Sequence, residues 1–288
     1  MTAKTALYRC SATLISLIQG VQRINRSDRQ ASAETLSGLN RSPNVNHQAK
    51  SYTADQRGGN AGMRALWLAG PVQRGAKNRM PAMSALERAF CRSSAWRFVA
   101  RKAVLPWALN HHSLTGDVLE IGGGSGAMAA AAAHSFGHAR ITVIDVDQTM
   151  VDTARLALAG FPHVNVQNAD VTALPFETAS FDMVTSYLML HHVIDWQDAL
   201  AEVSRVMKPG GAFIGYDLTD TRLARWVHRI DGSPHRIIAP GELADGLAAA
   251  GLTDISVRLS FRGHLMRFHG RRRRAAPPGR HSPAAARR

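Results

Sequence analysis

Cysteine is nearly absent from the chain, since Cys10 and Cys91 are the only two among 288 residues. They lie far apart in sequence and provide neither the paired cysteines of a small secreted scaffold nor the ligands of a zinc site. This composition is typical of a reducing compartment and favours the cytoplasm. We therefore expect no structural disulfide and no metal site.

Long apolar runs are missing as well. Residues 14–21 are apolar, but polar residues interrupt them, and the stretch is far shorter than the roughly 18 apolar residues of a membrane span. Lys4 and Arg9 precede it in the manner of a signal peptide, yet no clear cleavage site follows. The sequence thus predicts no membrane span and no targeting signal.

Acidic residues are scarce at both ends of the chain. Residues 1–82 carry 12 Lys and Arg against 3 Asp and Glu, and residues 271–288 carry 7 Arg and no acid. The intervening residues 83–270 hold 16 basic and 18 acidic residues, so the formal charge of +14 belongs to the ends. Polar, aperiodic ends cannot bury enough apolar surface to offset the entropy of ordering. We expect a disordered leader over 1–82, one folded domain over 84–270 and a disordered Arg-rich tail over 271–288.

This uneven charge also bears on the partner that the chain binds. A pI near 11.0 is typical of nucleic-acid-binding proteins, but the central segment is close to neutral. Arg271 to Arg274 could contact phosphates or acidic lipids, although a terminal charge run is more often simply solvated. We therefore favour a small-molecule partner over nucleic acid, and nothing in the sequence indicates the oligomeric state.

Residues 117–136, DVLEIGGGSGAMAAAAAHSF, combine a short apolar run, a glycine-rich turn and an alanine-rich stretch. The apolar run is typical of a strand that is buried on both faces of a parallel sheet. Glycine suits the turn because it tolerates positive φ and lets the backbone approach a ligand closely. Strand, glycine turn and helix together form the first unit of a nucleotide-binding α/β fold.

The glycine turn alone fits two kinds of ligand. Gly122, Gly124 and Ala127 fit the G-x-G-x-x-G/A dinucleotide pattern, and Asp145 follows at the distance of a ribose-binding acid. The same glycines, with Glu120 before them, also fit E-x-G-x-G-x-G. The segments that follow have to decide between the two.

The rest of the domain alternates strands with helices. An S-x-x-E capping box at Ser84 and Glu87 predicts the start of an amphipathic helix that runs through Val104 and ends at Pro106. Apolar periodicity then predicts strands at 140–147, 164–168, 181–187 and 212–217, helices at 149–159, 199–207 and 241–250, and a terminal hairpin of 255–261 and 264–268. This alternation predicts a doubly wound parallel α/β sheet.

The order of these pieces resembles the class I S-adenosylmethionine (SAM) dependent methyltransferases of type 11, the group with the ubiquinone and menaquinone enzymes. The motifs that carry the resemblance are the acid and glycine turn, the strand-end Asp145, D-x-x-x-LPF at 170–176, FD at 181–182, LHH at 190–192 and VMKPGG at 206–211. The resemblance covers residues 117–217 closely and 240–270 more loosely. It implies a Rossmann-like doubly wound seven-stranded sheet with an antiparallel last strand. A NAD-dependent oxidoreductase has no place for these motifs.

Carried over by position, the resemblance implies a SAM site formed by Glu120, Gly122, Gly123, Gly124, Gly126, Asp145, Val146, Asp170 and Val171. The first of these lies near the methionine amino group, Asp145 accepts from the ribose hydroxyls, Asp170 receives the adenine amino group, and the two valines contact adenine. Each acid also has an ordinary structural role open to it, since an aspartate at a strand end often caps a helix. Asp147 is better explained as such a cap.

Candidates for the chemistry are Tyr187, His191, His192 and Asp217, which lie at or after the ends of the fourth and fifth strands. Histidine is the usual base near neutral pH, but the resembling enzymes share LHH across very different acceptors, which favours a scaffold role. Trp96, Phe98, Trp226 and His228 lie in two segments that could cover the site.

The sequence thus predicts transfer of a methyl group from SAM to a small organic or lipid-like acceptor by in-line displacement. A non-catalytic SAM-binding partner protein with RNA-contacting basic tails is the alternative from another class.

Overall fold

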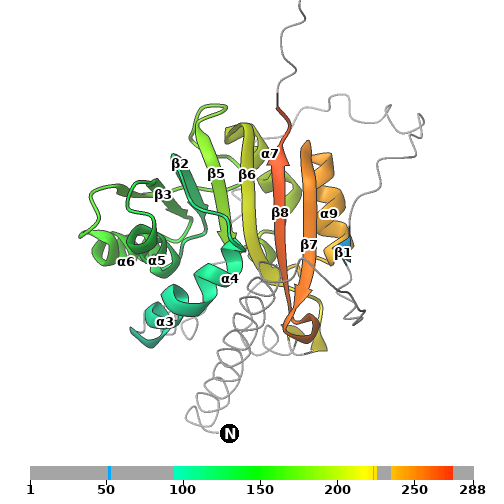
Figure 1. The fold of residues 1–288 in the computed structure, drawn as a ribbon, viewed down its shortest axis with the longest axis horizontal. Coiled ribbons are helices and arrows are strands. Elements are labelled where there is room, and N and C mark those ends of the chain that lie inside the picture. Colours follow the sequence, from blue (N-terminus) through cyan, green and yellow to red (C-terminus); the bar gives the residue numbers. More distant parts are fainter. Residues whose placement is uncertain (1–50, 53–93, 223, 226–234, 275–288) are drawn as a thin grey trace, which may run out of the picture.

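The computed structural model describes residues 51–52, 94–222, 224–225 and 235–274, which form one mixed sheet with helices on both faces (Figure 1). The strands are β1 Ser51–Tyr52, β2 Asp117–Ile121, β3 Arg140–Asp145, β4 Val164–Asn168, β5 Phe181–Tyr187, β6 Met207–Leu218, β7 Leu252–Ser260 and β8 Leu265–Arg272. Their order in the sheet is β1-β7-β8-β6-β5-β2-β3-β4. The predicted capping box, Trp226 and His228 lie outside the described residues.

The direction of the strands confirms the predicted fold class. β2, β3, β4, β5 and β6 pair in parallel, whereas β8 pairs antiparallel with both β6 and β7. β2 to β8 therefore make a seven-stranded doubly wound sheet with an antiparallel last strand. β1 adds two residues of the leader to the edge of β7, within the segment for which composition predicts disorder.

Two layers of helices cover the sheet. The helical elements are α3 Ser94–Val99, the π-helical η1 Ala100–Val104, α4 Leu105–Leu109, α5 Ala127–Ser135, α6 Gln148–Leu158, α7 Trp196–Val206 and α9 Pro240–Ala249, with short 3₁₀ turns η2 Leu190–His192 and η3 Phe261–Gly263. Elements η1, α4, α5 and α6 pack on one face, and α7 and α9 on the other. None of the described helices is long and apolar enough to cross a membrane.

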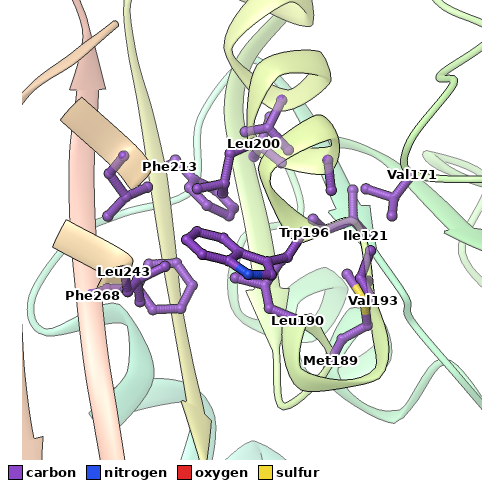
Figure 2. Close-up of a cluster of buried hydrophobic side chains, with 14 of the residues drawn as sticks. Ile121, Val171, Met189, Leu190, Val193, Trp196, Leu200, Phe213, Leu243 and Phe268 are labelled. Atoms are coloured by element: carbon purple, nitrogen blue, oxygen red, sulfur yellow. The ribbon is translucent and has the colours of Figure 1, made fainter. Parts of the chain in front are cut away.

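Each face of the sheet has its own core, because alternate side chains of a strand enter opposite layers. Val118 of β2 packs on the α5 side, whereas Leu119 and Ile121 pack on the α7 side. The second core centres on Trp196, whose ring lies against side chains of α7, β6 and α9 (Figure 2). These cores hold β2, β5 and β6 rigidly, and with them the residues at the strand ends.

The prediction that Pro106 ends the first helix is wrong. The N–H of Leu105 donates to the carbonyl of Ala100, five residues back, in a π-helical turn. Pro106 then falls in the first turn of α4, a position at which proline is well tolerated. The chain stays helical to Leu109, and Asn110 ends it in the left-handed conformation.

The fifth predicted strand is longer than the apolar residues 212–217 indicate. β6 begins at Met207, which pairs with Phe181, and the next paired residues are Met183 and Ala212. The KPGG segment is therefore a bulge inside β6 rather than a turn before it. Gly211 is needed there because a Cβ would lie 2.8 Å from the carbonyl oxygen of Asp182.

The carboxyl-terminal boundary of the domain lies beyond residue 270. β8 continues to Arg272, and its last two residues pair with β6 and β7. The guanidinium of Arg271 donates to the carbonyl of Gly210 at 3.1 Å, and that of Arg272 to the carbonyl of Arg205 at 3.0 Å. The first arginines of the basic tail thus belong to the sheet, because they satisfy carbonyl groups at the end of α7 and in the bulge.

Candidate functional site

The carboxyl ends of β2, β3, β5 and β6 bring the predicted site residues to one edge of the sheet. Ile121, the last residue of β2, pairs with Ile144 of β3 and Ser186 of β5. Tyr187 pairs with Tyr216 of β6. In an open α/β sheet this edge is where ligands bind, so the register supports the location that the sequence indicates.

The glycine turn after β2 is shaped by backbone conformation and by Asp145. Gly122, Gly124 and Gly126 have φ values of +63°, +53° and +78°, a region that side chains other than glycine rarely adopt. The N–H of Gly124 donates to Oδ2 of Asp145 at 2.8 Å, and the N–H of Asp147 donates to Oδ1 at 2.9 Å. The carboxylate at the end of β3 therefore holds the turn in place.

Burial also changes the acidity of Asp145. Its desolvation raises the pKa above the ordinary aspartate range, although the N–H groups of Asp147 and Gly124 partly offset that effect. Each carboxylate oxygen has a second acceptor direction beyond its backbone contact. Asp145 can thus accept two further hydrogen bonds from a ligand such as a ribose.

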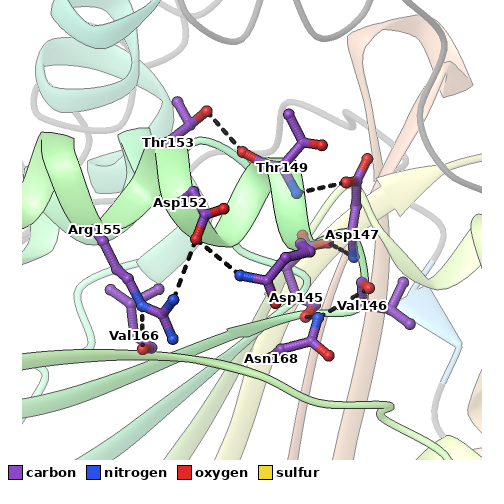
Figure 3. A network of polar contacts seen from close by, with 10 residues as sticks. Asp145, Val146, Asp147, Thr149, Asp152, Thr153, Arg155, Val166 and Asn168 are labelled. Carbon is purple, nitrogen blue, oxygen red and sulfur yellow. Dashed lines mark hydrogen bonds and ion pairs between the residues drawn. The ribbon is translucent and has the colours of Figure 1, made fainter.

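A side chain that the sequence did not single out supports this loop. The amide of Asn168, the last residue of β4, donates to the carbonyls of Asp145 and Val146 at 2.9 Å each (Figure 3). The only sequence signal for Asn168 is that a polar residue ends the strand next to the one that ends in Asp145. Asp147 accepts from the N–H of Thr149 at 2.8 Å, which confirms its prediction as a helix cap.

Asp170 and Val171 follow β4 in a local turn. Oδ1 of Asp170 accepts from the N–H of Thr172 at 2.8 Å and from its hydroxyl at 2.7 Å. Val171 is buried in the core that also contains Ile121 and Ile144. Val146 is half-buried. Asp170 is thus partly buried in this turn, whereas Val171 anchors the loop in the core.

Glu120 is the most perturbed acid of the site. Its side chain is 3% exposed, and this burial raises its pKa to about 8, although the N–H of Ala129 in the first turn of α5 opposes the shift. Glu120 pairs with Thr185 of β5. Tyr187 lies two residues further along that strand and therefore on the same face of the sheet as Glu120. The Tyr187 hydroxyl is buried, and burial followed by the charge of Glu120 raises its pKa, although a hydrogen bond with the Thr185 side chain opposes the shift.

The structure joins two of the predicted catalytic candidates. Nδ1 of His191 lies 2.5 Å from Oδ1 of Asp217, and its backbone N–H donates to Oδ2 at 3.1 Å. The N–H of Leu218 donates to Oδ1 at 2.7 Å. Asp217 is 1% exposed, so its carboxylate is enclosed together with these donors at the end of β6. This pairing favours the scaffold role for His191, whose ring also lies 4.1 Å from that of His192.

The connection after β6 is attached to the same histidine. The backbone N–H of Arg236 donates to the carbonyl of His191 at 2.7 Å. The Arg236 guanidinium lies 5.8 Å from the ring centroid of Trp196, and Ile238 is buried. The part of this connection that leads into α9 is thus fixed to η2.

An aromatic cluster covers the ends of β5 and β6 from the α4 side. The ring of Trp107 lies 5.1 Å from Tyr216 and 5.2 Å from Phe261, and Tyr187 lies 5.9 Å from Tyr216. Sequence reasoning missed Trp107 because it treated the helix as finished at Pro106. Of the residues it proposed as covers, Trp96 packs against the core and Phe98 is 61% exposed.

A metal centre has no evident location in this region. Across residues 94–222 and 235–274, no group of three or more His, Cys, Asp or Glu side chains is arranged to hold a metal ion.

Residues 119–215 match the methyltransferase domain family. The chain is 35% identical over 119 residues to a demethylmenaquinone methyltransferase of Clavibacter sepedonicus, covering 41% of this chain and 45% of the relative. The chain thus spans about half the length of the curated relatives it matches.

Two solved structures share the fold. The protein solved in complex with the Trm112 methyltransferase activator of Haloferax volcanii has a TM-score of 0.56 at 18% identity, covering 66% of this chain and 95% of that one. Phosphoethanolamine N-methyltransferase 2 of Haemonchus contortus, in complex with S-adenosyl-L-methionine, has a TM-score of 0.53 at 16% identity, covering 65% of this chain and 60% of that one.

Proposed function

We propose that this chain, which matches the methyltransferase domain family over residues 119–215, binds SAM and transfers its methyl group to a small organic or lipid-like acceptor. The observation that carries the proposal is the glycine turn held by Asp145 directly above the buried carboxyl group of Glu120. This arrangement offers hydrogen-bond acceptors for a ribose and an acid for an amino group at one sheet edge.

In this proposal, different residues of the site contact different parts of the cofactor. Asp145 accepts from the ribose hydroxyls, and Asp170 accepts from the adenine amino group beside Val146. The backbone of the turn from Gly122 to Gly126 approaches the methionine part, because no Cβ separates it from the ligand. When bound, SAM supplies a methyl group on a sulfonium sulfur, which is already a good leaving group.

The acceptor would lie against the aromatic cluster. Trp107, Tyr187, Tyr216 and Phe261 pack together beside the ends of β5 and β6, and an aromatic wall of this kind suits a planar or lipid-like molecule. The name of the Clavibacter relative, a demethylmenaquinone methyltransferase, supports an acceptor of that kind. The protein then has to align the nucleophile with the methyl group and exclude water. Tyr187 is the candidate to touch the acceptor, and His191 with Asp217 positions the loop behind it.

Calorimetry on the full chain tests the cofactor. We expect SAM and S-adenosylhomocysteine to bind and NAD to give no response. Asp145→Ala should weaken SAM binding by about 1.5–3 kcal/mol, because charge-assisted hydrogen bonds are lost. Asp152→Ala, at an exposed carboxylate of α6 paired with Arg155, is the matched control and should bind SAM normally. Binding of NAD alone would refute the proposal.

A further inference from the structure

The carboxyl group of Glu120 is buried beneath the glycine turn, and its residue is only 3% exposed. Its neighbours on the same face of the sheet are Val143 of β3 and Thr185 of β5, and the glycine turn crosses above it. A Cβ on Gly123 would lie 3.3 Å from Oε1 of Glu120 and would overlap Val143. The backbone of Gly123 therefore passes close to the carboxyl group with no side chain between them, at the point where a ligand would meet the turn.

No cation among the described residues compensates a charge on Glu120. From α5 it receives only the N–H of Ala129, and the titratable group that faces it from β5 is the Tyr187 hydroxyl. The basic residues of η1, Arg101 and Lys102, are exposed, as is His134 in the last turn of α5. A buried carboxylate without a paired charge is strongly destabilised, and it takes up a proton instead.

We propose that Glu120 is a neutral acid in the unliganded protein and exchanges its proton for the ammonium group of the bound cofactor. This inference rests on the proposed function and adds to it a selection rule for ligands. The proton leaves to solvent, and the carboxylate that remains forms an ion pair with the amino group of the methionine part. A ligand without a cationic group at this position leaves Glu120 protonated and gains no such contact.

The exchange has a definite stoichiometry. With a pKa of about 8, about nine in ten molecules carry the proton at pH 7. An ion pair with an ammonium group lowers the pKa of the carboxyl group. Binding at pH 7 should therefore release close to one proton. By linkage, the dissociation constant should fall about tenfold for each pH unit between pH 5.5 and 7, a range in which the ligand's amino group stays protonated.

Titration calorimetry of the full chain with S-adenosylhomocysteine measures this release directly. The binding enthalpy is compared at pH 7 in phosphate and in Tris, whose ionisation enthalpies differ, and the dissociation constant is followed from pH 5.5 to 7. We expect about 0.9 proton released per ligand. Infrared spectroscopy should show the carbonyl band of a protonated carboxylic acid that disappears when the ligand binds.

Glu120→Gln separates this role from a structural one. Glutamine keeps the size and neutrality of the protonated acid, so the variant should unfold at a similar temperature. It should release no proton, bind with a pH-independent affinity and lack the infrared band. Glu177→Gln, at an exposed position, should behave like the unmodified chain. Binding without proton release, at an affinity that does not change with pH, would overturn this inference and leave the proposed function intact. Absence of binding at every pH would instead overturn the proposed function and this inference with it.

Discussion

Replacing Asp217 with alanine should destabilise the domain strongly, because three N–H groups, two of them buried, would lose their shared acceptor. Oδ1 accepts from Nδ1 of His191 at 2.5 Å and from the N–H of Leu218 at 2.7 Å, and Oδ2 accepts from the N–H of His191 at 3.1 Å. Each buried donor left without a partner costs about 1–3 kcal/mol. The costs are not additive, and breaking a buried ionic or hydrogen-bonded pair typically costs about 3–5 kcal/mol. We expect a loss of that size in the free energy of unfolding.

Urea unfolding of the full chain at pH 7 measures this loss. Asp217→Asn should cost less, because its amide oxygen still accepts hydrogen bonds. A double-mutant cycle with His191→Ala should give a coupling energy of about 1–3 kcal/mol. Asp245→Ala, at an exposed position of α9, should change the stability by less than about 0.5 kcal/mol. If Asp217→Ala costs under 1 kcal/mol with an unchanged m-value, the pair does not hold β6 to η2 as we describe.

The strands of this domain could be predicted because their side chains enter two separate cores. Val118, Leu119 and Ile121 are apolar although they face opposite layers, which is the pattern of a strand buried on both faces. Four glycines in five positions then require a tight turn. Once β2 and β3 are recognised as parallel neighbours, the position of Asp145 beside the glycine turn follows from the topology alone.

The contacts between distant segments could not be predicted. His191 and Asp217 are 26 residues apart, and no local periodicity indicates that the turn after β5 folds back over the end of β6. Trp107 was not predicted as part of the helix, because a proline normally interrupts one. The π-helical turn before Pro106 places this proline in a first turn. The KPGG bulge was missed because two glycines and a proline are also typical of a turn. In each case the deciding partner comes from a different element.

Two further predictions concern the sheet. Partial burial raises the pKa of Asp182, but the hydrogen bond and charge of Lys208 outweigh it, so the pKa lies below the ordinary value of 3.8. Both side chains are more than one-third exposed, and Lys208→Ala should therefore cost less than about 1 kcal/mol at pH 7. Because the pKa is depressed in the folded state, this difference from the unmodified chain should shrink as the pH falls below about 4, in urea unfolding measured from pH 3 to 7. Gly215 lies in β6 where this strand approaches β5 closely, since a Cβ there would overlap the carbonyl oxygen of Ser186 in β5. Gly215→Ala should consequently cost about 1–3 kcal/mol or more in the free energy of unfolding. Gly241→Ala in the first turn of α9 meets no atom within 4 Å and should stabilise by about 0.4–1 kcal/mol, because alanine restricts the unfolded chain. Equal effects of the two substitutions would mean that β5 and β6 can separate locally, which contradicts the close strand register that positions Tyr187.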